Sequence, residues 1–314
     1  MERIPFCRGP NDYFKDSENT LYTNQSFMRK LGMNLKDSMV TGGACVVNEL
    51  LNQQTQLIFC VPGESYLGVL DACFDARDDL QVVSCRHESG AAFMAVAQAQ
   101  LTGKAGVCFL SRGPGACNAS IALHVARQSS IPVVVGIGQV RKPNLGREAF
   151  QEIDYNDFYR SVTKEVLEID AVEDLGITIR HAFDAAESGR PGPVAVVMPE
   201  DILLEQTPFV PSTPLAKAVA STSQDNLQKI SRCLADSERP LIIVGGTVWK
   251  DEECRSLQAF AAKNDVPVLA SFRRQDIFDN NHPCYGGYLG YGTHENVWSL
   301  AEEADCVLIF GARM

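Results

Sequence analysis

The sequence predicts an α/β protein made of two domains, each built on a parallel sheet. A length of 314 residues is too great for one ordinary core and suits two domains. From Val40 onward, short apolar runs alternate with helical patterns, as in sheets that helices cover on both faces. The stretch 205–222 contains prolines and no clear period, so we expect a linker there.

The first alternating series is expected to form one domain at 38–204. Its apolar runs are rich in Val and Ile and are short enough to be buried strands rather than helices. Its helical stretches show the apolar spacing of amphipathic helices. A polar loop is expected after the fourth strand. The predicted strands, with any closing turn, are 57–63, 80–85, 106–110, 132–138 and 193–199, and the predicted helices are 46–54, 66–76, 88–103, 117–130 and 171–189.

The second series, at 223–314, predicts a smaller α/β domain with three strands. It ends directly after an apolar strand, which would leave a hydrophobic sheet edge exposed, so we expect an incomplete domain. Residues 1–37 are a polar extension without the apolar segment of a secretory signal. The predicted strands are 241–246, 267–271 and 306–311, and the predicted helices begin near 225, 253 and 295.

Composition excludes several classes of protein. A formal net charge of -11 argues against a nucleic-acid-binding surface, which needs clustered Lys and Arg. No apolar run is long enough to span a bilayer, so no membrane partner is expected. The 11 cysteines include no CxxC pair and several lie in apolar runs, which favours buried, reduced thiols and a cytoplasmic location.

Three loops follow predicted strands directly, at 61–65, 85–90 and 111–118. In open parallel sheets, ligands bind beyond the carboxyl ends of the strands, so these loops are the candidate binding region. Taken singly, each has a simpler explanation. A carboxylate in the first turn of a helix, such as Glu88, stabilises the helix dipole. The glycines of the GPG stretch permit a turn and close backbone approach.

Together and in order, the motifs closely resemble the N-terminal, pyrimidine-binding domain of thiamine diphosphate-dependent enzymes of the acetolactate synthase type. The resemblance covers 38–204, and 205–314 looks like the first half of the central, Rossmann-like domain of that family. The motifs are VPGES at 61–65, RHESGAAFMA at 86–95, TGKAGVCFLSRGPGACNAS at 102–120, SIPVVVGIGQV at 130–140, GREAFQEIDY at 146–155 and SGRPGPVAVVMPEDIL at 188–203.

The resemblance implies a catalytic role for Glu88. In the family, the matching carboxylate hydrogen-bonds N1′ of the aminopyrimidine ring and promotes loss of the thiazolium C2 proton, after which the cofactor acts on a 2-oxo acid. The neighbouring His87 is not expected to take part, because adjacent helical residues do not share a face. The resemblance also implies cofactor contacts at Pro62, Gly63, Gly113, Pro114, Gly115, Asn118 and Gln128, and a substrate pocket that includes Phe150 and Gln151.

The sequence departs from the family pattern at two positions, and one family motif does not occur. RQSSIP lacks the Asp that often precedes this Ser, and Cys117 stands where Thr is usual. The family holds the diphosphate and Mg²⁺ through a GDG motif and a downstream Asn, and no GDG occurs in the sequence. We therefore expect no metal ligands here, weak or no cofactor binding, and no activity of the chain alone.

The sequence leaves two questions open: whether the chain binds FAD and whether it is catalytic. Some members bind FAD in the central domain, and the GYLGYG stretch at 287–292 does not follow the dinucleotide pattern that joins a strand to a helix. The chain is either the N-terminal portion of a transferase or lyase acting on 2-oxo acids, or a non-catalytic truncated fragment or homologue that dimerises without retaining cofactor. A dinucleotide-dependent oxidoreductase is excluded, because no GxGxxG follows the first strand.

The family resemblance also implies a homodimer or homotetramer, because its active sites form between subunits. The helices that follow Glu88 and Asn118 would then pack on a second copy. We expect small and apolar residues at the surface of these loops and helices. Alternatively, these helices only cover the sheet of their own domain. The residues expected at this surface are Gly63, Tyr66, Gly90, Ala91, Ala92 and Phe93.

Overall fold

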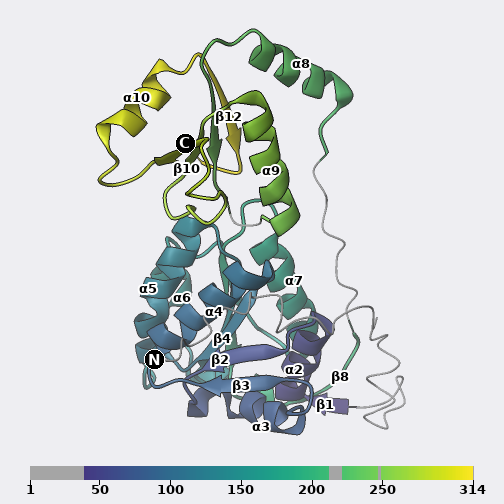
Figure 1. Cartoon of the computed structure of the whole chain (residues 1–314). Coiled ribbons are helices and arrows are strands. Elements are labelled where there is room, and N and C mark those ends of the chain that lie inside the picture. The colour runs from purple at the N-terminus through teal and green to yellow at the C-terminus, as the bar shows by residue number, and fades with distance from the viewer. Residues whose placement is uncertain (1–38, 212–220, 247–248, 314) are drawn as a thin grey trace, which may run out of the picture.

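The computed structural model describes residues 39–211, 221–246 and 249–313, and it confirms the predicted α/β class (Figure 1). The first part of the chain forms a six-stranded sheet and the second part a four-stranded sheet. All the strand pairs within these two sheets are parallel. The expected extension at 1–37 lies outside the described residues.

The six-stranded sheet has the order β3-β2-β4-β5-β7-β6. Every residue of its two longest strands, β5 and β7, is buried. Because all pairs are parallel, the carboxyl ends of the strands lie along one edge. The strands are β2 (Leu57–Cys60), β3 (Gln81–Ser84), β4 (Gly106–Leu110), β5 (Val133–Gln139), β6 (Glu165–Glu168) and β7 (Pro193–Pro199).

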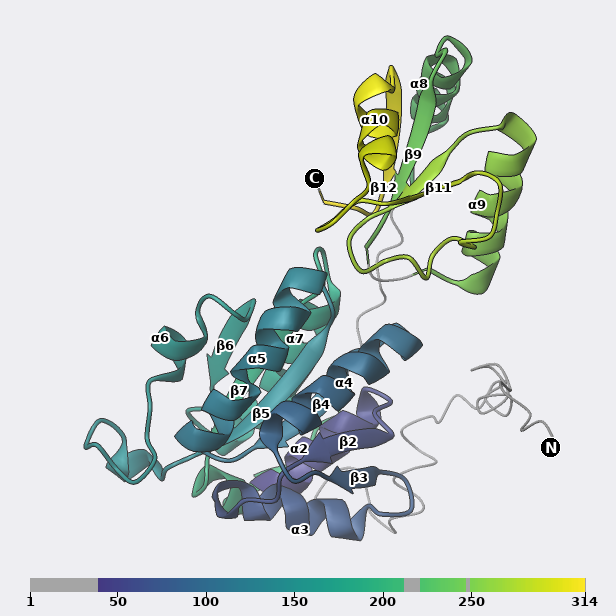
Figure 2. The same cartoon turned by 60° about the vertical axis from the view of Figure 1, so that its left-hand side comes forward.

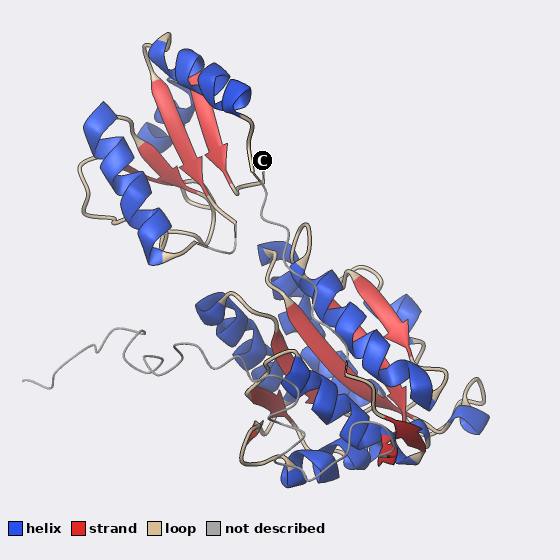
Figure 3. Ribbon diagram, turned by 90° about the vertical axis from the view of Figure 1, so that its right-hand side faces the viewer, coloured by secondary structure: helices blue, strands red, loops and turns tan. Residues whose placement is uncertain are grey.

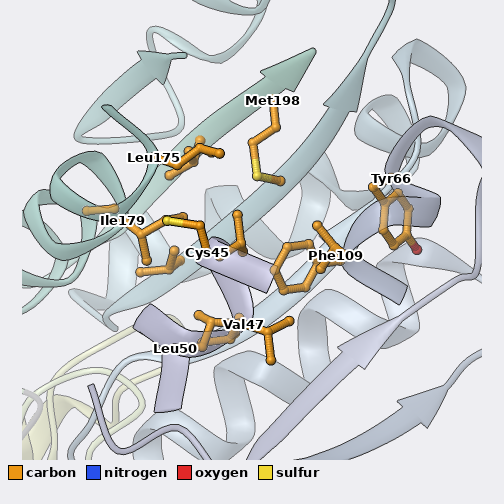
Figure 4. Packing of buried hydrophobic residues seen from close by; sticks show 14 of the residues in the cluster. Cys45, Val47, Leu50, Tyr66, Phe109, Leu175, Ile179 and Met198 are labelled. Atoms are coloured by element: carbon orange, nitrogen blue, oxygen red, sulfur yellow. The ribbon is translucent and has the colours of Figure 1, made fainter. Parts of the chain in front are cut away.

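Helices cover both faces of this sheet (Figure 3). On one face, α2 (Gly42–Asn52), α3 (Leu67–Asp75) and α7 (Leu175–Glu187) contribute to one hydrophobic cluster, in which Figure 4 shows Leu50, Leu175 and Phe109. On the other face, the alanine-rich helices α4 (Glu88–Thr102) and α5 (Gly113–Ser129) contribute to a second cluster, together with the short helix α6 (Tyr155–Tyr159). Adjacent strand residues such as Cys108 and Phe109 enter opposite clusters, as the pleat requires.

The first domain contains elements that the sequence did not reveal. The predicted polar loop holds α6 and β6, whose sequence EVLE is half-buried and lacks an apolar run. The predicted linker begins with β8 (Gln206–Pro208), which pairs antiparallel with β1 (Met39–Thr41). Helix α5 begins at Gly113, earlier than the predicted start at 117, so the GPG stretch is helical rather than a separate turn.

The second sheet has the order β11-β10-β9-β12, one strand more than predicted. The additional strand β11 has the sequence YGGY, which lacks an apolar run and so gave no strand signal. Helix α9 packs on one face and α10 on the other, as Figure 2 shows. The elements are α8 (Gln224–Ala235), β9 (Pro240–Val244), α9 (Asp251–Asn264), β10 (Val268–Ala270), β11 (Tyr285–Tyr288), α10 (Glu295–Glu303) and β12 (Cys306–Phe310).

The glycine-containing stretch 287–292 runs from the end of β11 to the turn before α10. It therefore joins a strand to a helix, which the sequence interpretation did not expect. Its glycines still do not have the G-x-G-x-x-G spacing. None of the helices in the described part of the chain combines the length and apolarity that a membrane crossing requires.

Candidate functional site

Glu88 is the first residue of α4 and follows the carboxyl end of β3, as the sequence predicted. The preceding residue, His87, occupies the N-cap position. Its Nδ1 atom accepts a hydrogen bond from the backbone N–H of Ser89 at 3.2 Å and lies 2.8 Å from the Ser89 hydroxyl. His87 therefore helps to start the helix that presents Glu88.

The Glu88 carboxylate is half-buried against the first turns of α5. Nδ2 of Asn118 donates a hydrogen bond to Glu88 Oε2 at 2.9 Å. The other oxygen, Oε1, faces Gly115, where an added Cβ would lie 3.2 Å away. Two predicted site residues, Gly115 and Asn118, thus meet Glu88 directly, and both come from α5, which follows the next strand along the chain, β4.

The glycines of the site pack the strand-end loops against one another. A Cβ at Gly63 would lie 2.7 Å from Ser111 Cβ, and one at Gly115 would lie 2.8 Å from Ser111 Oγ. Gly113 donates its N–H to the carbonyl of Gln151 at 2.9 Å, and a Cβ there would lie 2.7 Å from the same oxygen. Glycine is therefore required at these positions by contacts within the chain itself.

The remaining predicted residues are divided between this region and a distant one. Pro62 and Pro114 are exposed beside the glycines, and Phe150 is exposed next to Gln151. Gln128 is not brought to this site, because it lies at the opposite end of α5. At 1.5 Å of rise per residue, the 15 positions from Gly113 to Gln128 span about 22 Å.

A cavity of about 810 Å³ lies at the same edge of the sheet, and the sequence interpretation did not identify it. Arg112, which lines it, is buried and forms an ion pair with Glu200 at the end of β7. A second carboxylate, Glu64, lies 3.8 Å from Arg112 Nη1. The signal in the sequence that could have indicated this cavity is Arg112, a charged residue between an apolar strand and the GPG stretch. The lining residues are Glu64, Ser65, Leu67, Gly68, Arg112, Arg141, Glu200, Asp201, Leu203, Leu204 and Glu205.

The cysteines within the described residues are all free. Burial raises the pKa of Cys45 to about 11 and the pKa values of Cys73 and Cys108 to about 12. These three thiols stay protonated at neutral pH. Cys117 and Cys233 are exposed, so the expectation of buried thiols holds for only part of the set. Across 39–211, 221–246 and 249–313, no three His, Cys, Asp or Glu side chains form a group that could hold a metal ion.

Family models match both domains of the chain. Residues 40–158 match "Thiamine pyrophosphate enzyme, N-terminal TPP binding domain" and residues 227–314 match "Thiamine pyrophosphate enzyme, central domain". The first match contains Glu88, Asn118 and the glycines that pack around them.

Several acetolactate synthases are similar to the chain over most of its length. The acetolactate synthase isozyme 2 large subunit of Escherichia coli is 34% identical over 275 residues, covering 87% of this chain and 50% of the relative. An acetolactate synthase of Mycobacterium leprae is 34% identical over 279 residues, covering 87% of this chain and 44% of the relative. A probable acetolactate synthase large subunit of Methanocaldococcus jannaschii is 32% identical over 280 residues, covering 87% of this chain and 47% of the relative.

The chain spans about half the length of the curated relatives it matches. Its two matched segments follow each other in the order N-terminal domain, central domain. The chain belongs to the thiamine diphosphate-dependent enzymes and is of the acetolactate synthase type.

Proposed function

We propose that this chain supplies the pyrimidine-binding part of a thiamine diphosphate-dependent carboligase or lyase that acts on 2-oxo acids. The observation that supports this best is the position of Glu88. Its carboxylate is half-buried at a helix N-terminus, hydrogen-bonded by Asn118 and bordered by Gly115. A carboxylate held in this way can share a proton with a ring nitrogen of a bound ligand.

The residues around Glu88 fit the flat ring of an aminopyrimidine. Gly63, Gly113 and Gly115 let the strand-end loops pack closely beside Glu88, so that backbone rather than side chains would border a planar group. Pro62 and Pro114 are exposed at the same place and would supply rigid apolar contacts. These five residues, with Asn118, are the proposed cofactor contacts in this chain, and Gln128 is not among them.

Thiamine diphosphate, when bound, supplies the electron sink that cleavage or formation of a bond next to a carbonyl requires. The task of Glu88 is to hold a proton at N1′ of the ring, and Asn118 fixes the orientation of the carboxylate. The N-terminus of α4 favours negative charge at Glu88. Phe150 and Gln151, on the loop that contacts Gly113, are the proposed substrate-facing residues.

The same proposal covers the metal ion, a flavin and the cellular location of the protein. Mg²⁺ would be held with the diphosphate by groups outside this chain. A flavin is not included, because 287–292 does not have the dinucleotide spacing. A cytoplasmic location is supported by free thiols in buried strands.

A two-fold assembly through α4 and α5 is also proposed. Their outer faces expose Phe93, Met94, Leu101 and Ile121, an apolar surface suited to a second copy. The expectation that Tyr66, Ala91 and Ala92 would lie on this surface is wrong, because their side chains are fully buried in the first domain. Analytical ultracentrifugation tests the assembly, and a strictly monomeric chain at high concentration would contradict it.

Calorimetric titration of thiamine diphosphate with Mg²⁺ tests how much of the cofactor site this chain holds. Contacts to the pyrimidine ring alone leave little affinity after the entropy of association is subtracted. We expect weak binding or none, and correspondingly no activity of the chain by itself. Submicromolar binding would show that the diphosphate site lies within these 314 residues. A dimer without any detectable cofactor binding would favour the second candidate, a non-catalytic homologue.

A further inference from the structure

The outer face of α3 carries apolar side chains that are open to solvent. Leu67 and Phe74 are 59% and 66% exposed, and Leu70, between them, is half-buried. Because residues three, four and seven positions apart share one face of a helix, these three side chains form a single stripe along α3. Leu204, at the end of the short helix η5 (Ile202–Leu204), is 68% exposed and lines the same cavity as Leu67. We call these four residues the α3 stripe.

Acidic side chains border the α3 stripe. Between 64 and 79 the chain carries five carboxylates and one guanidinium group, which gives a net charge of -4, and all six groups are exposed. The one guanidinium group, that of Arg77, lies 4.7 Å from the centroid of the Phe74 ring. An apolar stripe with a charged border is typical of a contact site, and this one fits a partner that is both apolar and cationic. The carboxylates are those of Glu64, Asp71, Asp75, Asp78 and Asp79.

The complementary chemistry occurs in the same chain, in residues 27–36, which precede the described part of the structure. Their sequence, FMRKLGMNLK, contains five apolar side chains, three basic ones and no acidic one. The segment therefore carries a charge of +3 opposite the charge of -4 beside the stripe. The basic residues are Arg29, Lys30 and Lys36.

The length of chain between this segment and α3 allows the two to meet. Lys36 is separated from β1 by only two residues, and β1 leads into α2. In α2, Gly43 packs so closely on α3 that an added Cβ would lie 2.1 Å from the backbone oxygen of Gly68. Figure 1 shows β1, α2 and α3 together at one end of the first domain. The seven steps from Lys36 to Gly43 can span about 25 Å, and ten extended residues can span about 35 Å, well beyond the length of α3, about 14 Å.

We propose that residues 27–36 bind the α3 stripe of their own chain. The apolar side chains of the segment would cover the exposed leucines and Phe74, and its basic side chains would meet the carboxylates at the border. Removal of apolar surface from water supplies the affinity, and the opposite charges select the site. Because the segment is tethered next to β1, its effective concentration at the stripe is high, so individually weak contacts are sufficient.

Photocross-linking on the full 314-residue chain tests this binding directly. Benzoylphenylalanine at position 27, in place of Phe27, forms a bond on irradiation with whatever lies beside it, and mass spectrometry of peptides locates that bond. We expect cross-links to the peptide 64–79 within a chain of monomeric mass. The same group in place of Tyr13, which precedes the basic segment, should give a clearly lower yield at this peptide.

Charge reversal tests how the segment is recognised. Arg29→Glu combined with Lys30→Glu should lower the yield of the 64–79 cross-link about threefold or more, because several exposed ion pairs are lost together. Adding Asp71→Lys and Asp75→Lys should restore the yield. Both carboxylates are exposed and form no ion pair within the described residues, so α3 should keep its fold.

A matched pair of substitutions controls for general charge effects. Glu252→Lys and Glu302→Lys reverse two exposed carboxylates on α9 and α10 of the second sheet and should not restore the yield. Any of three results would overturn the inference: no cross-link to 64–79, equal yields from positions 13 and 27, or a yield that charge reversal does not change. Cross-links that join two chains would also overturn it and assign the stripe to a segment of a second copy. Since no cofactor is involved, the proposed role of Glu88 is independent of the outcome.

Discussion

Strands of similar composition have very different surroundings in the two sheets. β5 and β7 are rich in Val, and every one of their residues is buried. β12 has the equally apolar sequence CVLIF, yet none of its residues is buried, and Val307, Ile309 and Phe310 are 40–45% exposed. The cause is topology: β5 and β7 have strands on both sides, whereas β12 pairs only with β9.

The flanking helices differ in the same way. The first domain has two large hydrophobic clusters, one on each face of its sheet, whereas α8 and α10 bury no residue completely. An apolar pattern therefore predicts that a segment is a strand or an amphipathic helix, but the neighbours decide how much area is buried. The first sheet should account for most of the stability measured on this chain.

The largest difference is expected from a matched pair of leucine substitutions. Leu123→Ala, in α5, removes a fully buried side chain and should lower the free energy of unfolding by about 2–5 kcal/mol. Leu227→Ala, in α8, removes a side chain that is 48% exposed and should cost about 1 kcal/mol or less.

Two spectroscopic signals separate the domains in a urea titration. Both tryptophans, Trp249 and Trp298, lie in the second part of the chain, so their fluorescence reports on the second sheet. Far-ultraviolet circular dichroism reports on both parts. Leu123→Ala should shift the circular dichroism transition and leave the fluorescence transition in place. Equal losses of unfolding free energy in Leu123→Ala and Leu227→Ala would contradict the difference in burial between the two sheets.

The sequence predicted most of the first domain because its strands are continuous apolar runs between helical patterns. It missed β6 and β11, whose sequences EVLE and YGGY carry no such run and are strands only because a neighbour pairs with them. It placed Glu88 at a helix start and named Asn118 as a possible ligand contact, but it did not predict the hydrogen bond between them. It did not find Arg112 and its cavity, because the partners Glu64 and Glu200 are distant in the chain and meet only after folding.

A smaller difference in the free energy of unfolding is expected from alanine substitutions at two glycines, one that packs against α4 and one that lies inside it. A Cβ at Gly106 of β4 would lie 2.0 Å from the backbone oxygen of Ala95, so Gly106→Ala must displace α4 and should cost about 1–3 kcal/mol. Gly90, inside α4, has open space at its Cβ position, and Gly90→Ala should stabilise the domain by up to about 1 kcal/mol. Urea titrations of both variants check the sign, and destabilisation by Gly90→Ala would contradict the packing described.

The smallest expected effect concerns the loop that carries Phe150 and Gln151. The Glu152 carboxylate accepts hydrogen bonds from the N–H groups of Gly146 and Ala149, and these hold its pKa below the ordinary 4.5. Because the folded pKa is lowered, the contribution of Glu152 to loop order is present above the ordinary pKa. It is lost as the pH falls through the lowered value.

Hydrogen exchange followed by mass spectrometry measures this order. Glu152→Gln should speed exchange in the peptide around Gly146 near neutral pH, and the difference from the unsubstituted chain should vanish in acid. Glu148→Gln changes an exposed carboxylate in the same loop and serves as the control. A difference that persists unchanged in acid would show that the carboxylate charge does not order the loop.

The Glu88 carboxylate is proposed to serve the cofactor ring, and the substitution Glu88→Gln tests this role. The substitution keeps the size of the side chain and removes the proton-sharing oxygen. It should be made in a form of the protein that carries a diphosphate-binding domain, with turnover of a 2-oxo acid as the assay and circular dichroism as the check on folding. This role predicts a loss of activity of about a hundredfold or more in a folded protein. Near-normal turnover by folded Glu88→Gln would contradict it.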